Sequence, residues 1–274
     1  MQNRMFALNM QGEKIILDIP PIIVEKLKYL NIHLVSIADG NAYISVRKYN
    51  SKAYKIWIRS NSLITSEIVP VKVILFKLFV EIEDYIMKKK IEHDSSAIAL
   101  HGGGVIHNGK TVLVLQGKGA GKSTLIAKLV QMSSKYLSDD LLISYGNRVL
   151  GIPLPIRLRH LNIVGLEGVK EGKSIEGLDF NNETRYFYTP ELENENSDVP
   201  ISTILIPHYS LNCSNEIVQI KGKEKISIIA NQVKRYANME QLYKNIIAIS
   251  KEVKVYHLYY KDFSILDSFF SMFL

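Results

Sequence analysis

Short apolar runs separated by turn residues occupy the beginning of the chain and predict β-strands. Residues 32–38 and 41–46 flank an Asp-Gly dipeptide at 39–40, which favours the tight turn of a β-hairpin. Residues 53–59 alternate weakly between apolar and polar side chains, as a half-buried strand does. The pattern therefore predicts a β-rich N-terminal lobe over residues 1–69.

The period of the apolar positions changes after Pro70. Starting at Val71, apolar residues recur at offsets of 0, 3, 4, 7, 8 and 11, which is one face of an amphipathic helix. Proline is tolerated in the first turn of a helix, and the lysines at 88–90 suit a helix C-terminus. We expect a helix over residues 71–87 that links the N-terminal lobe to a second domain, residues 70–274.

The second domain alternates between predicted strands and helices. Two further hairpins are expected, one joining 104–107 to 111–115 through Asn108-Gly109 and one joining 141–145 to 148–152 through Gly146-Asn147. The segment 165–196 has little apolar periodicity and predicts a long mobile stretch with one short element at 186–188. The remaining pattern predicts helices at 123–131, 226–237, 239–249 and 263–274, and strands at 201–207 and 253–259.

The clearest chemical signal is the sequence TVLVLQGKGAGKST at positions 111–124, where an apolar strand meets a helix through a glycine-rich loop. Glycines let consecutive backbone N–H groups point at phosphate oxygens, and the helix N-terminus adds its dipole. We expect the Lys122 amine to reach the β- and γ-phosphates of a nucleotide and the Ser123 hydroxyl to bind Mg²⁺. Gln116 stands where the usual pattern has its first glycine. The predicted nucleotide-binding residues are Gly117, Lys118, Gly119, Ala120, Gly121, Lys122, Ser123 and Thr124.

Two further elements belong near this loop. Asp139 and Asp140 follow Lys122 at the point where the chain returns to the sheet. Adjacent side chains of an extended segment point to opposite sides, so one carboxylate can hold Mg²⁺ while the other faces an acceptor. His101 precedes the 104–115 hairpin, which can carry its imidazole back toward the nucleotide.

Composition and charge restrict the class of protein. One cysteine, Cys213, excludes an internal disulfide framework and a CxxC metal site. The N-terminus lacks the apolar stretch of a signal peptide, and no apolar run reaches the ~20 residues that cross a bilayer. We therefore expect a cytoplasmic protein without a membrane partner. The net charge is +7, with the excess in residues 1–90 and 201–274, so these flanks are free to meet an acidic protein or peptide.

The order of these elements resembles a known family. His101-Gly102, the hairpin at Asn108-Gly109, the loop at 117–124 and the Asp139-Asp140 pair are arranged as in the C-terminal catalytic domain of HPr serine kinase/phosphorylase. The resemblance is tight over residues 97–145. It implies an α/β fold with a P-loop core related to phosphoenolpyruvate carboxykinase, here preceded by an N-terminal β-rich segment.

The same resemblance assigns roles to residues. It implies that Asp140 acts as base on an acceptor serine, that Asp139 helps to hold Mg²⁺, and that His101 lines the acceptor or phosphate side. It also implies a homo-oligomer. Arg157, after the constrained turn at 153–155, is the best candidate for an arginine on the γ-phosphate, ahead of Arg159 and Arg185.

One departure from the family concerns the substrate. The family has a Glu-Ile-Arg-Gly-Leu-Gly motif after the aspartates, whereas this chain has RHLNIVG at 159–165. The chain is more similar to stand-alone members of the family, some of which resemble kinases that phosphorylate a serine of ribosomally made precursor peptides, including lasso-peptide precursors.

The expected function is ATP- and Mg²⁺-dependent transfer of a phosphoryl group to a serine-type hydroxyl of a peptide or protein. One alternative is a small-molecule kinase of the same fold. Another is a nucleotide-binding regulatory module without turnover, which Gln116 favours. A nucleic-acid-dependent NTPase is suggested only by the charge, and since no basic and aromatic residues interleave in the manner of an RNA-binding motif, we expect no nucleic-acid partner.

Overall fold

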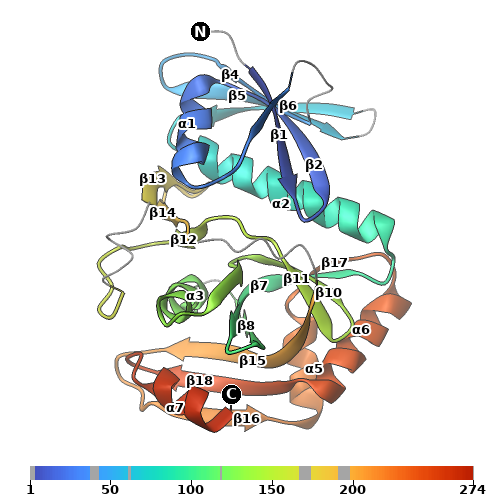
Figure 1. The fold of residues 1–274 in the computed structure, drawn as a ribbon, viewed down its shortest axis with the longest axis vertical. Helices are drawn as coiled ribbons and strands as arrows, with labels where there is room; N and C mark the ends of the chain where they lie inside the picture. The colour runs from blue at the N-terminus through green and yellow to red at the C-terminus, as the bar shows by residue number, and fades with distance from the viewer. Residues whose placement is uncertain are drawn as a thin grey trace.

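The described part of the chain is a mixed α/β fold built on three β-sheets (Figure 1). The computed structural model describes residues 4–37, 43–60, 63–117, 119–166, 174–190 and 198–273. Two large sheets lie one above the other in Figure 1, with the long helix α2 between them and a small third sheet beside it.

The first sheet is built entirely from the N-terminal residues. Its six strands lie in the order β3-β1-β2-β4-β5-β6. Their bounds are β1 Arg4–Met10, β2 Glu13–Ile19, β3 Val35–Ile37, β4 Ile44–Lys48, β5 Ala53–Ser60 and β6 Leu63–Pro70. Alternate residues of β2, β4 and β5 are buried, so one face of the sheet packs on α1 (Pro21–Tyr29) and α2 (Ile74–His93) while the other carries polar side chains.

Two predictions for this region are wrong in detail. The strands flanking residues 39–40 do not form a hairpin, because β3 pairs with β1 whereas β4 pairs in parallel with β2. The first sheet instead contains a β1–β2 hairpin among its inner strands, with seven paired positions, and the apolar pattern did not predict this hairpin. Asp39 and Gly40 lie outside the described residues. The linker helix expected at 71–87 spans 74–93 instead, because Pro70 still pairs with Ala53 at the end of β6.

The second sheet contains the predicted phosphate loop. Its main path is β11-β10-β7-β8-β15-β18-β16, and β9 and β17 also pair with β7. The strands are β7 Ile98–His107, β8 Lys110–Leu115, β9 Lys135–Ser138, β10 Leu141–Tyr145, β11 Arg148–Gly151, β15 Val199–Tyr209, β16 Glu216–Ile220, β17 Val233–Tyr236 and β18 Lys254–Tyr260. Strands β8, β15 and β18 run parallel, and both predicted hairpins of this domain are confirmed.

Helices cover both faces of these parallel strands. Helices α3 (Lys122–Gln131) and α7 (Ile265–Phe273) pack against one face, where the buried strand residues include Val114, Leu205 and Leu258. Helices α5 (Gly222–Ala230) and α6 (Met239–Glu252) pack against the other face, where the strands present Leu113, Leu115, Ile204 and Val255. The alternation along each strand therefore supplies two apolar layers. The helix expected at 226–237 is shorter and earlier, because residues 233–236 form β17 at the edge of β7.

Strand β7 is the centre of this arrangement. Its first half, up to His101, lies between β10 and β17, and its second half lies between β8 and β9. Glycines at 102–104 permit this crossing, since a Cβ atom on Gly103 would lie 2.5 Å from the Ser138 carbonyl oxygen and 2.9 Å from Asp139 Cα. The glycine run is thus a place of close backbone approach that brings residues 138–140 against the strand.

A three-stranded sheet completes the fold, in the order β12-β14-β13. It consists of β12 Ile156–Leu158, β13 Ser174–Leu178 and β14 Thr184–Tyr188. The short element expected at 186–188 is the end of β14, but the expectation of a mobile segment is wrong for residues 174–185, which belong to the same regular hairpin; residues 167–173 and 191–197 lie outside the described residues. The Leu178 N–H of the hairpin donates to the Lys72 carbonyl, in the turn before α2, at 2.9 Å, and the rings of Phe187 and Phe79 join the hairpin to α2 itself.

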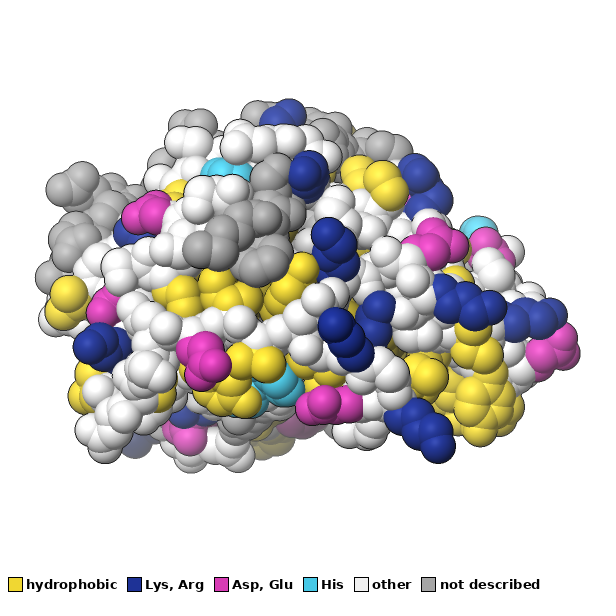
Figure 2. All heavy atoms as spheres, turned by 90° about the horizontal axis from the view of Figure 1, so that it is seen from below, with side chains coloured by type: hydrophobic (Ala, Val, Ile, Leu, Met, Phe, Trp, Pro, Cys, Tyr) yellow, Lys and Arg dark blue, Asp and Glu magenta, His cyan; other side chains and the backbone are white. Residues whose placement is uncertain are grey.

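One apolar core extends across the boundary expected at residues 69/70. It includes residues of β1, β2, β4, β5, β6, α1 and α2, and continues into residues of β10 and β11 such as Leu141 and Leu150. The division into two domains stays a prediction. None of the helices in the described ranges combines the length and the apolar character that crossing a membrane requires. On the face shown in Figure 2, basic side chains lie singly or in small groups with acidic ones between them.

Candidate functional site

The phosphate-binding loop connects β8 to α3. Four consecutive residues of β8, 112–115, are completely buried, so the strand fixes where the loop begins. Gly119 and Gly121 have φ angles of +89° and +86°, a left-handed conformation that glycine adopts without steric cost. Gly121 caps α3, and its carbonyl accepts from the Leu125 N–H at 2.9 Å. The loop therefore ends with the free N–H groups of a helix N-terminus, as a phosphate site requires.

Lys122 is the first residue of α3 and is 92% buried, with 8% of its surface exposed. Its Nζ lies 3.0 Å from His101 Nε2. Burial lowers the pKa of Lys122, while the charges of Asp140 and Asp139 act in the opposite direction. A buried amine is stabilised by a bound anion such as a phosphate, because burial of a charge without a partner is unfavourable.

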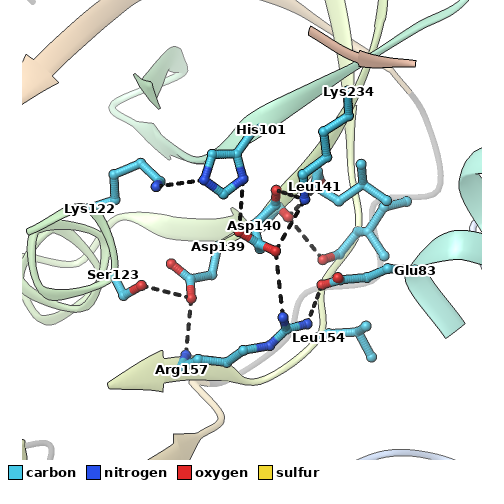
Figure 3. A network of polar contacts seen from close by, with 12 residues as sticks. Glu83, His101, Lys122, Ser123, Asp139, Asp140, Leu141, Leu154, Arg157 and Lys234 are labelled. Atoms are coloured by element: carbon cyan, nitrogen blue, oxygen red, sulfur yellow. Dashed lines mark hydrogen bonds and ion pairs between the residues drawn. The ribbon is translucent and has the colours of Figure 1, made fainter. Parts of the chain in front are cut away.

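Asp139 lies in the turn between β9 and β10 and is 5% exposed (Figure 3). Its Oδ2 accepts hydrogen bonds from Ser123 Oγ and from the Arg157 backbone N–H, both at 3.0 Å. Among the described residues, no donor bonds to its buried Oδ1. Burial raises the pKa of Asp139, and the neighbouring charge of Asp140 adds to this, against the hydrogen bonds that lower it.

These oxygens fit a magnesium ion. Mg²⁺ is usually bound through one or two carboxylates together with substrate phosphates and waters, not by a cage of protein ligands. Asp139 offers an unpaired carboxylate oxygen, and the Ser123 hydroxyl is already within 3.0 Å of the same carboxylate. Within the described ranges no cluster of three or more His, Cys, Asp or Glu side chains is placed to hold a metal.

Asp140 points the other way and meets three cationic or potentially cationic groups (Figure 3). Its carboxylate lies 3.0 Å from His101 Nδ1, 3.2 Å from Lys234 Nζ and 3.5 Å from Arg157 Nη1. Burial acts to raise the pKa of Asp140, but the hydrogen bond from His101 and the charges of Arg157 and Lys234 outweigh it and hold the pKa well below its usual range. The carboxylate is therefore ionised, and about a quarter of it remains exposed in the cleft.

Arg157 on β12 connects the two aspartates to α2. Its Nη2 donates to Glu83 Oε1, and the guanidinium lies 5.3 Å from the centre of the Phe76 ring. Burial raises the pKa of Glu83, although the charge of Arg157 opposes this, and Arg157 stays a cation. The arginine is thus fixed between a carboxylate and an aromatic ring before any substrate binds.

A cleft of ≈630 Å³ opens over these groups. Its volume is in the range of small-molecule and cofactor sites. It is lined by residues of the loop and aspartate pair and by Phe76, His101, Arg157, Leu158, Arg159, His160, Ile163, Asp179, Phe180, Asn181, Arg185 and Tyr209. The cleft is therefore bounded by the second sheet on one side and by α2 and the β12–β14 sheet on the other.

The structure brings most of the predicted site residues together. His101, Lys122, Ser123, Asp139, Asp140 and Arg157 form one network, and Gly119, Gly121 and Thr124 line the same cleft. Gly117 and Ala120 belong to the loop but do not line the cleft, and Lys118 lies outside the described residues. Among the other arginines, Arg185 is buried against Asp179 and Glu183, and Arg159 is half exposed.

Two members of the network were not predicted. Glu83 comes from α2, and its signal in the sequence is its position four residues after Phe79, on the apolar face of the helix. Lys234 comes from β17, which reaches the site only because it pairs with β7. No local pattern at residue 234 indicates this.

Comparisons with known proteins give a limited result. No protein-family model matches the chain, and no curated protein matches it. Among solved structures, the chain is similar to the Hpr(Ser) kinase/phosphatase from Coxiella burnetii, with 10% sequence identity and a TM-score of 0.29 over 61% of this chain and 80% of that chain. The match is a distant one, so the chemistry of the site has to come from its own residues.

Proposed function

We propose that the protein transfers the γ-phosphoryl group of ATP, in the presence of Mg²⁺, to a serine-type hydroxyl of a peptide or protein. The observation that carries the proposal is the division of labour between two consecutive carboxylates. Asp139 is bonded to Ser123 at the end of the phosphate loop, whereas Asp140 faces the cleft among His101, Arg157 and Lys234. Protein kinases likewise use one carboxylate on the metal side and another on the acceptor side.

The loop and Lys122 hold the donor. The N–H groups at the start of α3 and the Lys122 amine bind the phosphate oxygens, and Thr124 lines the same end of the cleft. Asp139 and Ser123 would hold Mg²⁺, which supplies positive charge to the β- and γ-phosphates when bound. Arg157, already fixed by Glu83 and Phe76, adds a cation beside the transferred group without needing to reorganise.

Asp140 is the acceptor-side base. The acceptor oxygen forms its bond to the γ-phosphorus as the bond from that phosphorus to the β–γ bridging oxygen breaks, and ADP leaves with the bonding electrons. The acceptor hydroxyl proton passes to the Asp140 carboxylate and then to solvent. The cations around Asp140 make it a weak base in the free protein. The negative charge of a bound phosphate chain offsets the cations around Asp140, so the pKa of Asp140 rises toward the value that the transfer needs.

A transfer assay with labelled ATP, Mg²⁺ and candidate acceptors tests the proposal. The acceptors are serine-containing peptides, including any encoded by neighbouring genes, together with matched peptides in which serine is replaced by alanine. We expect label on the serine peptides only. Asp140→Asn should retain ATP binding and lose transfer by about 10²–10⁴-fold, the range for a general base. Transfer by Asp140→Asn at the wild-type rate would refute the role of Asp140, and label on the alanine peptides would refute the acceptor.

A further inference from the structure

Two tyrosines stand beside the phosphate loop on the side away from the aspartates, and the inference drawn from them rests on the proposed nucleotide site. Tyr209 ends β15 and Tyr260 ends β18. Both strands run parallel to β8, so their carboxyl ends meet the same sheet edge as the loop. Ligands of open α/β sheets bind at this edge, which makes the two side chains candidates for ligand contact.

The contacts of the tyrosines differ. A Cβ atom on Gly121 would lie 2.9 Å from Tyr260 Oη and 3.7 Å from Tyr209 Cβ, so the end of the loop rests on both residues. Their rings are 5.4 Å apart and inclined at 55°. Tyr260 is 2% exposed, whereas Tyr209 is 54% exposed and lines the cleft. Tyr260 therefore supports the loop from beneath, and Tyr209 presents an aromatic surface to whatever occupies the cleft.

The direction of a bound nucleotide follows from the rest of the site. Transfer requires the γ-phosphate to lie near Asp140, which is on the β7 side of the loop. A nucleotide is elongated, with its base at the end opposite the γ-phosphate. The base therefore extends toward the other neighbour of β8, which is β15 with Tyr209 at its end.

We infer that Tyr209 stacks on the nucleobase of the phosphoryl donor. Stacking on an exposed aromatic ring is a common way to hold a base, because every base has a flat π-face. His160 and Ile163, which follow β12, line the same cleft and bound it on the side of the small sheet. The subsite thus takes a flat aromatic group linked to a phosphate chain, that is, a nucleoside triphosphate.

The hydroxyl of Tyr260 is an independent sign that a ligand completes this side of the loop. Among the residues that the structure describes, none forms a hydrogen bond with the buried Tyr260 Oη. A buried hydroxyl without a partner is unfavourable, so such groups are found where a ligand or a rearranged loop supplies the missing bond. A Cβ atom on Gly121 would lie 2.9 Å from this hydroxyl, so the hydroxyl lies directly against the end of the phosphate loop.

Calorimetric titration with ATP and with inorganic triphosphate, both with Mg²⁺, distinguishes the contribution of the nucleoside to binding from that of the phosphates. Tyr209→Ala should weaken ATP binding roughly 5- to 150-fold and leave triphosphate binding unchanged. Tyr209→Phe keeps the ring and should bind ATP as the wild type does. Tyr243→Ala removes a comparably exposed tyrosine from α6 and serves as the matched control.

The outcomes distinguish this inference from the proposed function. Equal loss of both ligands, or no loss of either, in Tyr209→Ala overturns the inference and leaves the kinase proposal standing. Tyr209-dependent ATP binding without any phosphoryl transfer by the wild type supports the inference and counts against the kinase proposal. Binding of neither ligand by the wild type overturns both.

Discussion

The buried pair between Glu83 and Arg157 gives the sharpest prediction about stability. Each side chain is 10% exposed, and the guanidinium donates directly to the carboxylate. Replacing Glu83 with alanine leaves a cation in the interior that cannot lose its proton. Replacing it with glutamine keeps an acceptor oxygen of similar shape and removes only the charge, so Glu83→Gln is the matched control.

The size of the effect follows from the surroundings. Removing one partner of a buried ion pair costs about 3–5 kcal/mol. In Glu83→Ala, Arg157 still has the Asp140 carboxylate at 3.5 Å. The loss in free energy of unfolding should therefore lie at the lower end of this range, about 3 kcal/mol. At roughly 2–4 °C per kcal/mol for a chain somewhat shorter than this one, the melting temperature should fall by roughly 6–12 °C. Arg157→Ala leaves a carboxylate whose pKa burial has already raised, and that group can take up a proton.

A double-mutant cycle measures the interaction itself. Urea unfolding followed by circular dichroism at neutral pH is applied to the wild type, to Glu83→Ala, to Arg157→Ala and to the double variant. We expect the double variant to be more stable than the sum of the single losses implies, by about 1–3 kcal/mol. Additivity within about 0.5 kcal/mol would show that the two side chains do not depend on each other and would refute the reasoning.

Three further predictions concern the loop, the glycine strand and a histidine pair. Lys122→Met should abolish phosphoryl transfer in the labelled-ATP assay while leaving the melting temperature unchanged or raised, because it removes a buried charge; a large loss of stability would contradict this. Gly103→Ala should lower both stability and Mg²⁺-dependent ATP binding, because the alanine methyl group would clash with the Asp139 backbone. Wild-type values of both would show that the backbones of β7 and Asp139 can move apart without cost. His208 in β15 and His257 in β18 form a pair, with Nε2 of the first 2.8 Å from Nδ1 of the second. Burial and the charge of His257 lower the pKa of His208, so the unfolded chain takes up a proton at a higher pH than the folded one, and stability should decrease as pH falls below the ordinary histidine pKa. His208→Gln should flatten that decrease in denaturant unfolding measured from pH 7 to 5, and an unchanged slope would assign it to other groups.

The parts of the site that lie close together in the sequence are the parts that local pattern predicts. The loop and the aspartates fall within 30 residues of one another, and each is marked by its own turn or strand signal. The sequence could also indicate Arg157 as a site residue, because a constrained turn precedes it. Lys234 and Glu83 could not be predicted from local pattern. Lys234 is 94 positions from its partner Asp140 in the sequence, and Glu83 is 74 positions from its partner Arg157.

The fold shows the same limit. The β7–β8 and β10–β11 hairpins and α3 depend on dipeptides and short apolar runs, so they were predicted nearly to the residue, whereas the hairpin expected around residues 39–40 does not form. Residues 233–236 have an apolar spacing compatible with a helix, and only the free edge of β7 makes them a strand. The β13–β14 hairpin is similar, because its strands are stabilised by α2 and β12 and not by a strong pattern of their own.

The several partners of β7 also determine when the site can form during synthesis. A chain made from its N-terminus has β8, β9 and β10 available soon after β7, but β17 follows roughly 90 residues after β10. Until β17 is made, the backbone edge of Ile98–Leu100 in β7 is unpaired and can pair with strands of other chains. Asp140 also lacks its ion pair with Lys234 until then. We therefore expect the phosphate loop of a nascent chain to be in place before the part of the site around Asp140 is complete, which requires the chain as far as β17.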